Sequence, residues 1–132
     1  MKRKPGGRDA PRILIVEDEP LVAQDLAYFV TDAGFRVGGP FSAVEQALAA
    51  LPKAAPPAIA ILDVKLRDGE IYPLADRLRE LGVPMIFHSA HVNERDIVQR
   101  YPSARVCCKP FDASLLRQVI DDVVASRSSP RK

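Results

Sequence analysis

The chain has 132 residues, of which 47% are hydrophobic and 27% are charged. These values are typical of a single soluble globular domain, and they exclude fibrous, collagen-like and wholly disordered chains. The longest apolar runs have the length of strands, and no apolar segment follows the basic N-terminus. We therefore expect neither a membrane span nor a signal peptide, and we predict a cytoplasmic location.

The positive net charge of +2 comes from the two ends of the chain. Eight of the 19 basic residues lie in residues 2–12 and 127–132, so residues 13–125 carry 11 basic and 16 acidic groups. We interpret residues 1–11 as a flexible basic tail, 12–125 as one domain and 126–132 as a polar tail, and we do not expect nucleic-acid binding. Cys107 and Cys108 are adjacent, which predicts neither a disulfide framework nor a zinc site.

Apolar periodicity alternates along the chain between strands and helices. Unbroken apolar runs predict strands over residues 12–16, 58–62, 83–87 and 105–108, with a weaker one over 35–38. Helical spacing predicts five helices, which begin near residues 20, 42, 71, 93 and 112. Ser42 and Glu45 form a predicted capping box, Asn93 and Asp112 are predicted caps, and residues 65–70 are predicted to be a polar loop.

Five strands that alternate with five helices predict a parallel sheet with helices on both faces, which is a three-layer α/β sandwich. Ligands of such sheets bind beyond the carboxyl ends of the strands. The polar residues at those ends are Glu17, Asp18, Glu19, Asp63, Ser89 and Lys109.

These residue types suit phosphoryl transfer. If the first and third strands are neighbours, the carboxylates of Glu17, Asp18 and Asp63 converge and repel one another. Mg²⁺, which prefers oxygen ligands and keeps several waters, would relieve that repulsion. A phosphoryl group on Asp63 would then meet the cation, the ammonium of Lys109 and the hydroxyl of Ser89, and such charge neutralisation does most of the catalysis in phosphoryl transfer.

Four ordered segments resemble the receiver domains of bacterial two-component response regulators, particularly stand-alone receivers of alphaproteobacterial type. They are ILIVEDEP over residues 13–20, AILDVKLRDGE over 60–70, IFHSA over 86–90 and CKPF over 108–111. The resemblance covers residues 11–125. It implies a flavodoxin-like (βα)5 fold with strand order 2-1-3-4-5.

The resemblance also implies a role for individual residues. Asp63 takes the place of the phosphoacceptor, Lys109 that of the phosphate-binding lysine, and Ser89 that of the hydroxyl residue that turns toward the phosphoryl group. In the family the peptide bond before Pro110 is cis. The implied ligands of Mg²⁺ are Glu17, Asp18, Asp63 and the backbone carbonyl of Lys65.

The implied phosphoryl donor is a sensor histidine kinase or a histidine phosphotransfer protein. A receiver assists its own phosphorylation and dephosphorylation but is not classed as an enzyme. Only about seven polar residues follow the last predicted helix, so we expect no attached output domain. Signalling would then act through binding of a target protein, or of a second copy, to the surface of the fourth helix, fifth strand and fifth helix.

Some residues depart from the family pattern and keep alternatives open. Val106 stands where many receivers have an aromatic switch residue, so a degenerate receiver that binds partners without phosphate is the main alternative. A flavodoxin-like cofactor enzyme or a small phosphotransferase is a third possibility, although no GxGxxG follows the first strand and no phosphate-binding glycine loop is present. We interpret His88 as structural. Lys65 and His91 form a hypothetical basic pair that slows or redirects hydrolysis of the phosphoryl group.

Overall fold

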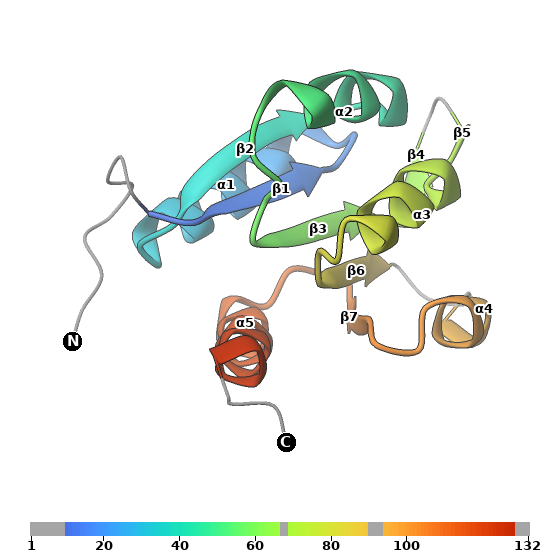
Figure 1. Cartoon of the computed structure of the whole chain (residues 1–132). Helices are drawn as coiled ribbons and strands as arrows, with labels where there is room; N and C mark the ends of the chain where they lie inside the picture. The colour runs from blue at the N-terminus through green and yellow to red at the C-terminus, as the bar shows by residue number, and fades with distance from the viewer. Residues whose placement is uncertain (1–9, 67–68, 90–93, 129–132) are drawn as a thin grey trace.

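Five parallel strands form the central sheet of the computed structural model, which describes residues 10–66, 69–89 and 94–128 (Figure 1). The order across the sheet is β2-β1-β3-β6-β7. Counted along the chain, this is the predicted flavodoxin-like order 2-1-3-4-5, and the prediction is confirmed. The strands are β1 (Arg12–Val16), β2 (Arg36–Phe41), β3 (Ile59–Asp63), β6 (Met85–Ser89) and β7 (Arg105–Cys108).

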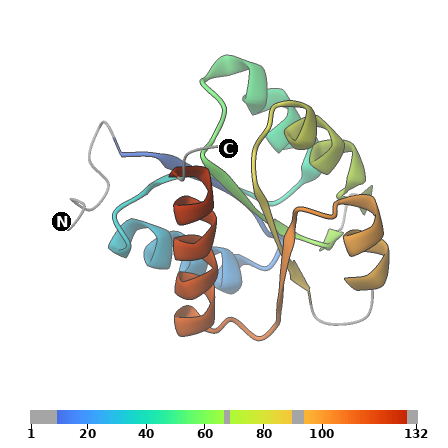
Figure 2. The same ribbon diagram turned by 60° about the horizontal axis from the view of Figure 1, so that its bottom comes forward.

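Helices cover both faces of this sheet, as Figure 2 shows. One face packs against α1 (Pro20–Asp32) and α5 (Ala113–Ser128). The other packs against α2 (Val44–Ala50), α3 (Tyr72–Glu80) and α4 (Glu94–Arg100), and the short 3-10 helix η1 (Leu51–Lys53) follows α2. No helix within the described ranges is both long enough and apolar enough to cross a lipid bilayer.

Strands β1 and β3 are almost wholly apolar because both of their faces are buried. Side chains along a strand point alternately to opposite faces. In β1, Ile13 and Ile15 therefore pack against α1 and α5, whereas Leu14 and Val16 belong to the core beneath α2 and α3. All five residues of β3, at the centre of the sheet, are buried. In these two strands the charged residues, Arg12 and Asp63, stand only at the ends.

Several predicted helix ends are confirmed by local geometry. Pro20 is the first residue of α1, where its missing N–H costs no hydrogen bond. Gly34 and Gly82 follow α1 and α3 with φ of 96° and 75°, a conformation that glycine adopts without strain. At the start of α5, the N–H of Leu115 donates to Oδ1 of Asp112 at 3.1 Å, which is the predicted cap.

The predicted capping box of Ser42 and Glu45 is wrong. Helix α2 begins at Val44 after Ala43, with no capping bond from a side chain. The N–H of Ser42 instead donates to Oε1 of Gln46 at 3.2 Å, so a glutamine in the first turn of the helix reaches back in place of Glu45. The predicted Asn93 cap lies outside the described residues.

Other element boundaries also differ from those predicted from the apolar periodicity. Strand β2 extends to Phe41, because the carbonyl of Phe41 accepts a hydrogen bond from the N–H of Glu17 at 2.9 Å. The fourth strand of the sheet, β6, lies two residues later than predicted. The predicted loop over residues 65–70 contains a small antiparallel hairpin, β4 (Lys65–Leu66) and β5 (Gly69–Glu70). Helix α5 continues to Ser128, into the segment that we assigned to the polar tail.

Candidate functional site

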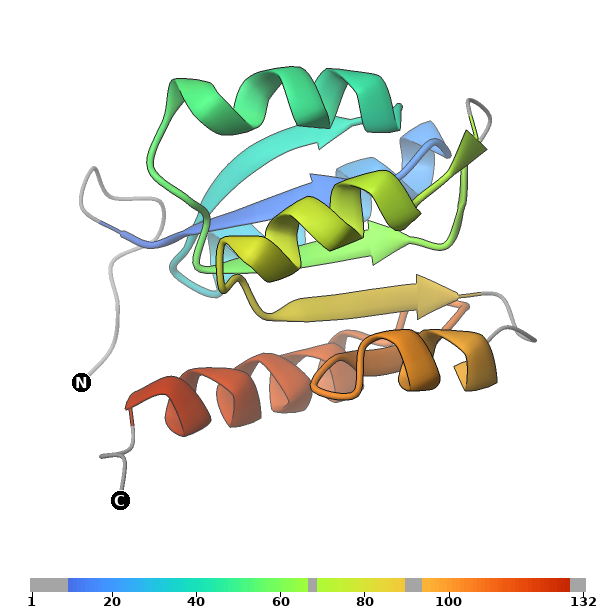
Figure 3. The same ribbon diagram turned by 45° about the vertical axis from the view of Figure 1, so that its right-hand side comes forward.

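One polar residue per strand follows the apolar core at the carboxyl end of the sheet. Residues Ile15, Ile61 and Ile86 lie side by side in register on the face that packs against α1 and α5. Two positions further along each strand, the same face carries a polar residue. Figure 3 shows β1, β3 and β6 running in the same direction, so these positions meet at one edge. They are Glu17 directly after β1, Asp63 of β3 and His88 of β6, and Lys109 directly follows the end of β7.

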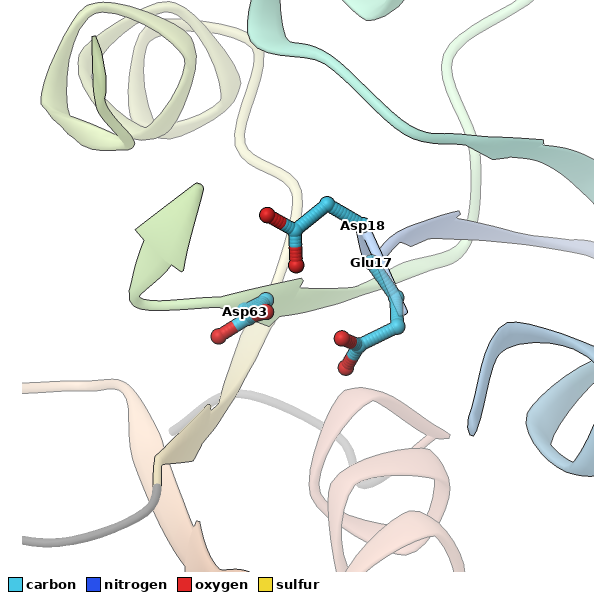
Figure 4. A group of neighbouring side chains, drawn as sticks. All are labelled: Glu17, Asp18 and Asp63. Atoms are coloured by element: carbon cyan, nitrogen blue, oxygen red, sulfur yellow. The ribbon is translucent and has the colours of Figure 1, made fainter. Parts of the chain in front are cut away.

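Three carboxylates converge at this edge. Oxygen atoms of Glu17, Asp18 and Asp63 all lie within 4.8 Å of one another (Figure 4). Glu17 and Asp63 are only 2% and 4% exposed, whereas Asp18 is half-buried. The adjacency of β1 and β3 brings the three side chains together, as the reasoning from the sequence required.

Lys109 supplies the positive charge of this cluster. Its Nζ lies 3.3 Å from Oδ2 of Asp63, 3.4 Å from Oε1 of Glu17 and 3.5 Å from Oε1 of Glu19. Its backbone N–H donates to the carbonyl of Ser89 at 2.6 Å, and the bond that joins it to Pro110 is cis. Burial alone would lower the pKa of Lys109, but the charges of Asp63 and Glu17 outweigh burial and raise it.

The geometry and electrostatics of the carboxylates fit a divalent cation. Burial, and then the hydrogen bond and negative charge of Asp63, raise the pKa of Glu17 to about 7. Its Oε1 is buried without a hydrogen-bond partner. Hard oxygen donors at this spacing are the ligands that Mg²⁺ prefers, and its charge would remove the repulsion between Glu17 and Asp63.

The structure also describes two further predicted site residues, Ser89 and Lys65. Ser89 is the last residue of β6, is 3% exposed, and pairs in register with Cys108 of β7. Its side chain lies on the sheet face opposite His88. The backbone of Lys65 begins β4, two residues after Asp63, and the ligand role of its carbonyl stays a prediction. His91, of the hypothetical basic pair, lies outside the described residues.

His88 belongs to the site, which the reasoning from the sequence missed. It is 3% exposed, and its Nδ1 lies 3.9 Å from Oε1 of Glu17. Its ring meets that of Phe111 edge-on at 6.5 Å. Burial and the charge of Lys109 lower the pKa of His88. The sequence did carry a signal, because His88 stands two residues after Ile86, just as Asp63 stands two residues after Ile61.

Comparison with known proteins agrees with this architecture. A family model described as the response regulator receiver domain matches residues 13–121. The phyllosphere-induced regulator PhyR of Methylorubrum extorquens is 30% identical over 125 residues, which are 93% of this chain and 47% of PhyR. The transcriptional regulatory protein PdtaR of Mycobacterium tuberculosis is 30% identical over 119 residues, which are 86% of this chain and 57% of PdtaR. The chain thus spans about half the length of these relatives.

Solved structures share the fold over nearly the whole chain. A response regulator receiver protein from Sinorhizobium medicae superposes with a TM-score of 0.82 at 23% identity, over 92% of this chain and 100% of its own. The receiver domain of PhyR from Erythrobacter litoralis superposes with a TM-score of 0.78 at 31% identity, over 93% and 96% of the two chains. The first likeness supports the fold, and the second supports relationship in sequence as well.

Proposed function

The chain belongs to the response regulator receiver family, and we propose that it accepts a phosphoryl group on Asp63 from a phosphohistidine, in a reaction that requires Mg²⁺. The observation that carries this proposal is the cluster itself. Asp63, at the end of the central strand, lies within 4.8 Å of two further carboxylates and 3.3 Å from an ammonium. Negative and positive groups thus both lie beside the acceptor carboxylate.

The protein's own groups account for most of the proposed step. A carboxylate oxygen of Asp63 attacks phosphorus, so that an O–P bond forms while the N–P bond of the phosphohistidine breaks. Lys109 turns from the carboxylates to the phosphoryl oxygens and neutralises charge there. Ser89 donates its hydroxyl to a second phosphoryl oxygen. Mg²⁺, held by Glu17, Asp18, Asp63 and the backbone carbonyl of Lys65, would supply further neutralisation of the transferring group.

Acetyl phosphate tests this proposal without a cognate kinase. The protein is incubated with Mg²⁺ and acetyl phosphate, and its intact mass is measured. We expect a gain of one phosphoryl group, loss of that gain in Asp63→Asn, and loss on chelation of Mg²⁺. Asp121→Asn is a matched control, because Asp121 is an exposed carboxylate on α5 whose partner is Arg117. A modified Asp63→Asn protein would refute the assignment, and an unmodified wild type would favour the degenerate receiver that binds without phosphate.

The proposed donor is a sensor histidine kinase or a histidine phosphotransfer protein, and the proposed setting is the cytoplasm. The chain itself is a phosphoacceptor that assists its own turnover and not an enzyme. Its output would be altered binding of a target protein, or of a second copy, at the surface formed by α4, β7 and α5. Val98 of α4 and Leu115 of α5 are 51% and 45% exposed, and each offers apolar contact area to a partner.

A further inference from the structure

Two buried polar atoms face each other beside the carboxylate cluster. They are Oε1 of Glu17 and Nδ1 of His88, and within the described ranges these are the buried side-chain atoms that lack a hydrogen-bond partner. They lie 3.9 Å apart, about 1 Å beyond hydrogen-bond distance. Buried polar groups are normally paired, because desolvation without a partner is unfavourable.

The environment fixes His88 more firmly than Glu17. His88 lies within β6, between Asp63 of β3 and Cys107 of β7 in register, and its ring packs edge-on against Phe111. Glu17 follows β1, and its longer side chain can move by changes of rotamer. An open pocket of about 520 Å³, lined by His88, Lys109 and Phe111, lies beside the histidine.

Lys109 forms ion pairs with both Glu17 and Asp63. Its Nζ is 3.4 Å from Oε1 of Glu17 and 3.3 Å from Oδ2 of Asp63. A divalent cation at the cluster would repel this ammonium, and a phosphoryl group on Asp63 would attract it. In either case Glu17 loses its contact with Lys109, and Nδ1 of His88 lies 3.9 Å from Oε1, the oxygen of Glu17 that lacks a hydrogen-bond partner.

We propose that His88 is a positioning residue for the metal site: its Nδ1–H donates to Oε1 of Glu17 when a cation occupies the cluster, and so holds that carboxylate in place. The other oxygen of Glu17 already accepts the backbone N–H of Glu19 at 3.2 Å, so the two donors together fix the carboxylate plane. This inference rests on the proposed metal dependence, but it does not require that Asp63 be phosphorylated.

The tautomer of His88 is the first test. A long-range proton–nitrogen NMR spectrum of the 15N-labelled protein shows which ring nitrogen carries the proton. The chain has two histidines, so the signals of His88 are those that disappear in His88→Asn. With saturating Mg²⁺ we expect a neutral ring protonated at Nδ1. A ring protonated only at Nε2 would overturn the proposal, since Glu17 would then have to be the donor.

Substitutions at His88 provide the second test, with Mg²⁺ affinity measured from amide chemical shifts. Asparagine places an N–H where Nδ1 stands, glutamine places one nearer Nε2, and leucine has none. Loss of a residue that orients a metal ligand typically weakens metal binding about tenfold or more. We therefore expect about tenfold weaker binding in His88→Leu and His88→Gln, and affinity close to wild type in His88→Asn.

The outcomes separate this inference from the proposed function. If His88→Leu binds Mg²⁺ as tightly as the wild type, the inference is wrong even when acetyl phosphate modifies Asp63. If binding follows the predicted order but no phosphoryl group is gained, the inference stands and the proposed function fails. A more stable His88→Leu protein with unchanged Mg²⁺ affinity would mean that His88 merely fills the core, which also contradicts the proposal.

Discussion

Replacing Glu17 by glutamine should change how the stability of the metal-free protein depends on pH. The carboxylate is 2% exposed, and burial together with Asp63 raises the pKa of Glu17 to about 7 from its ordinary 4.5. Glutamine keeps the shape of the side chain but cannot ionise. We expect the wild type to lose stability relative to Glu17→Gln as the pH rises from 5 to 8.

The sign and size follow from proton linkage. In the unfolded chain Glu17 releases its proton near pH 4.5, whereas the folded protein retains it until about pH 7. The folded state therefore binds more protons across this window, and the free energy of unfolding falls as pH rises. One pKa unit corresponds to about 1.4 kcal/mol, so the loss between pH 5 and 8 amounts to about 2–3 kcal/mol.

Urea unfolding at several pH values, in a chelating buffer, measures this difference. Contributions from other groups, including the lowered pKa of His88, enter both proteins and largely cancel in the comparison. Mg²⁺ at pH 8 should restore the stability of the wild type. At a Mg²⁺ concentration about a hundred times its dissociation constant, the free energy of unfolding should rise by about 2.7 kcal/mol. Stability curves of wild type and Glu17→Gln that run parallel from pH 5 to 8 would refute the reasoning.

Further predictions concern stability away from the cluster. Tyr101→Phe should lower the free energy of unfolding by about 1–2 kcal/mol, because the 2%-exposed tyrosine donates its hydroxyl to Oδ1 of Asp76 at 2.6 Å. Urea unfolding measures this, and an unchanged midpoint would contradict it. Gly82→Ala should lower the free energy of unfolding by about 1–2 kcal/mol. Backbone strain at positive φ is the whole cause, because an added Cβ would meet no atom within 4 Å. Gly39→Ala should cost more, because its Cβ would lie 2.6 Å from the backbone nitrogen of Phe41; equal melting temperatures for the two alanine variants would exclude that clash.

Local sequence determined the parts of this protein that depend on one segment at a time. The apolar runs that form β1 and β3 are recognisable because strands buried on both faces tolerate little else. Asp112 caps α5 through its own neighbour three residues on, so that cap could be read directly. The candidate residues Glu17, Asp63 and Lys109 could be found because a charged residue directly after an apolar run stands out.

Tertiary structure decided everything that depends on two segments at once. Strand β2 reaches Phe41 because β1 offers it a partner, which its own weak pattern does not show. Gln46 displaced the predicted capping box because it reaches Ser42 in space. The likeness to receivers gave the strand order, but the 3.9 Å approach of His88 to Glu17 arises from strands separated by β3. Long-range register and side-chain reach set such contacts, and a one-dimensional pattern does not contain them.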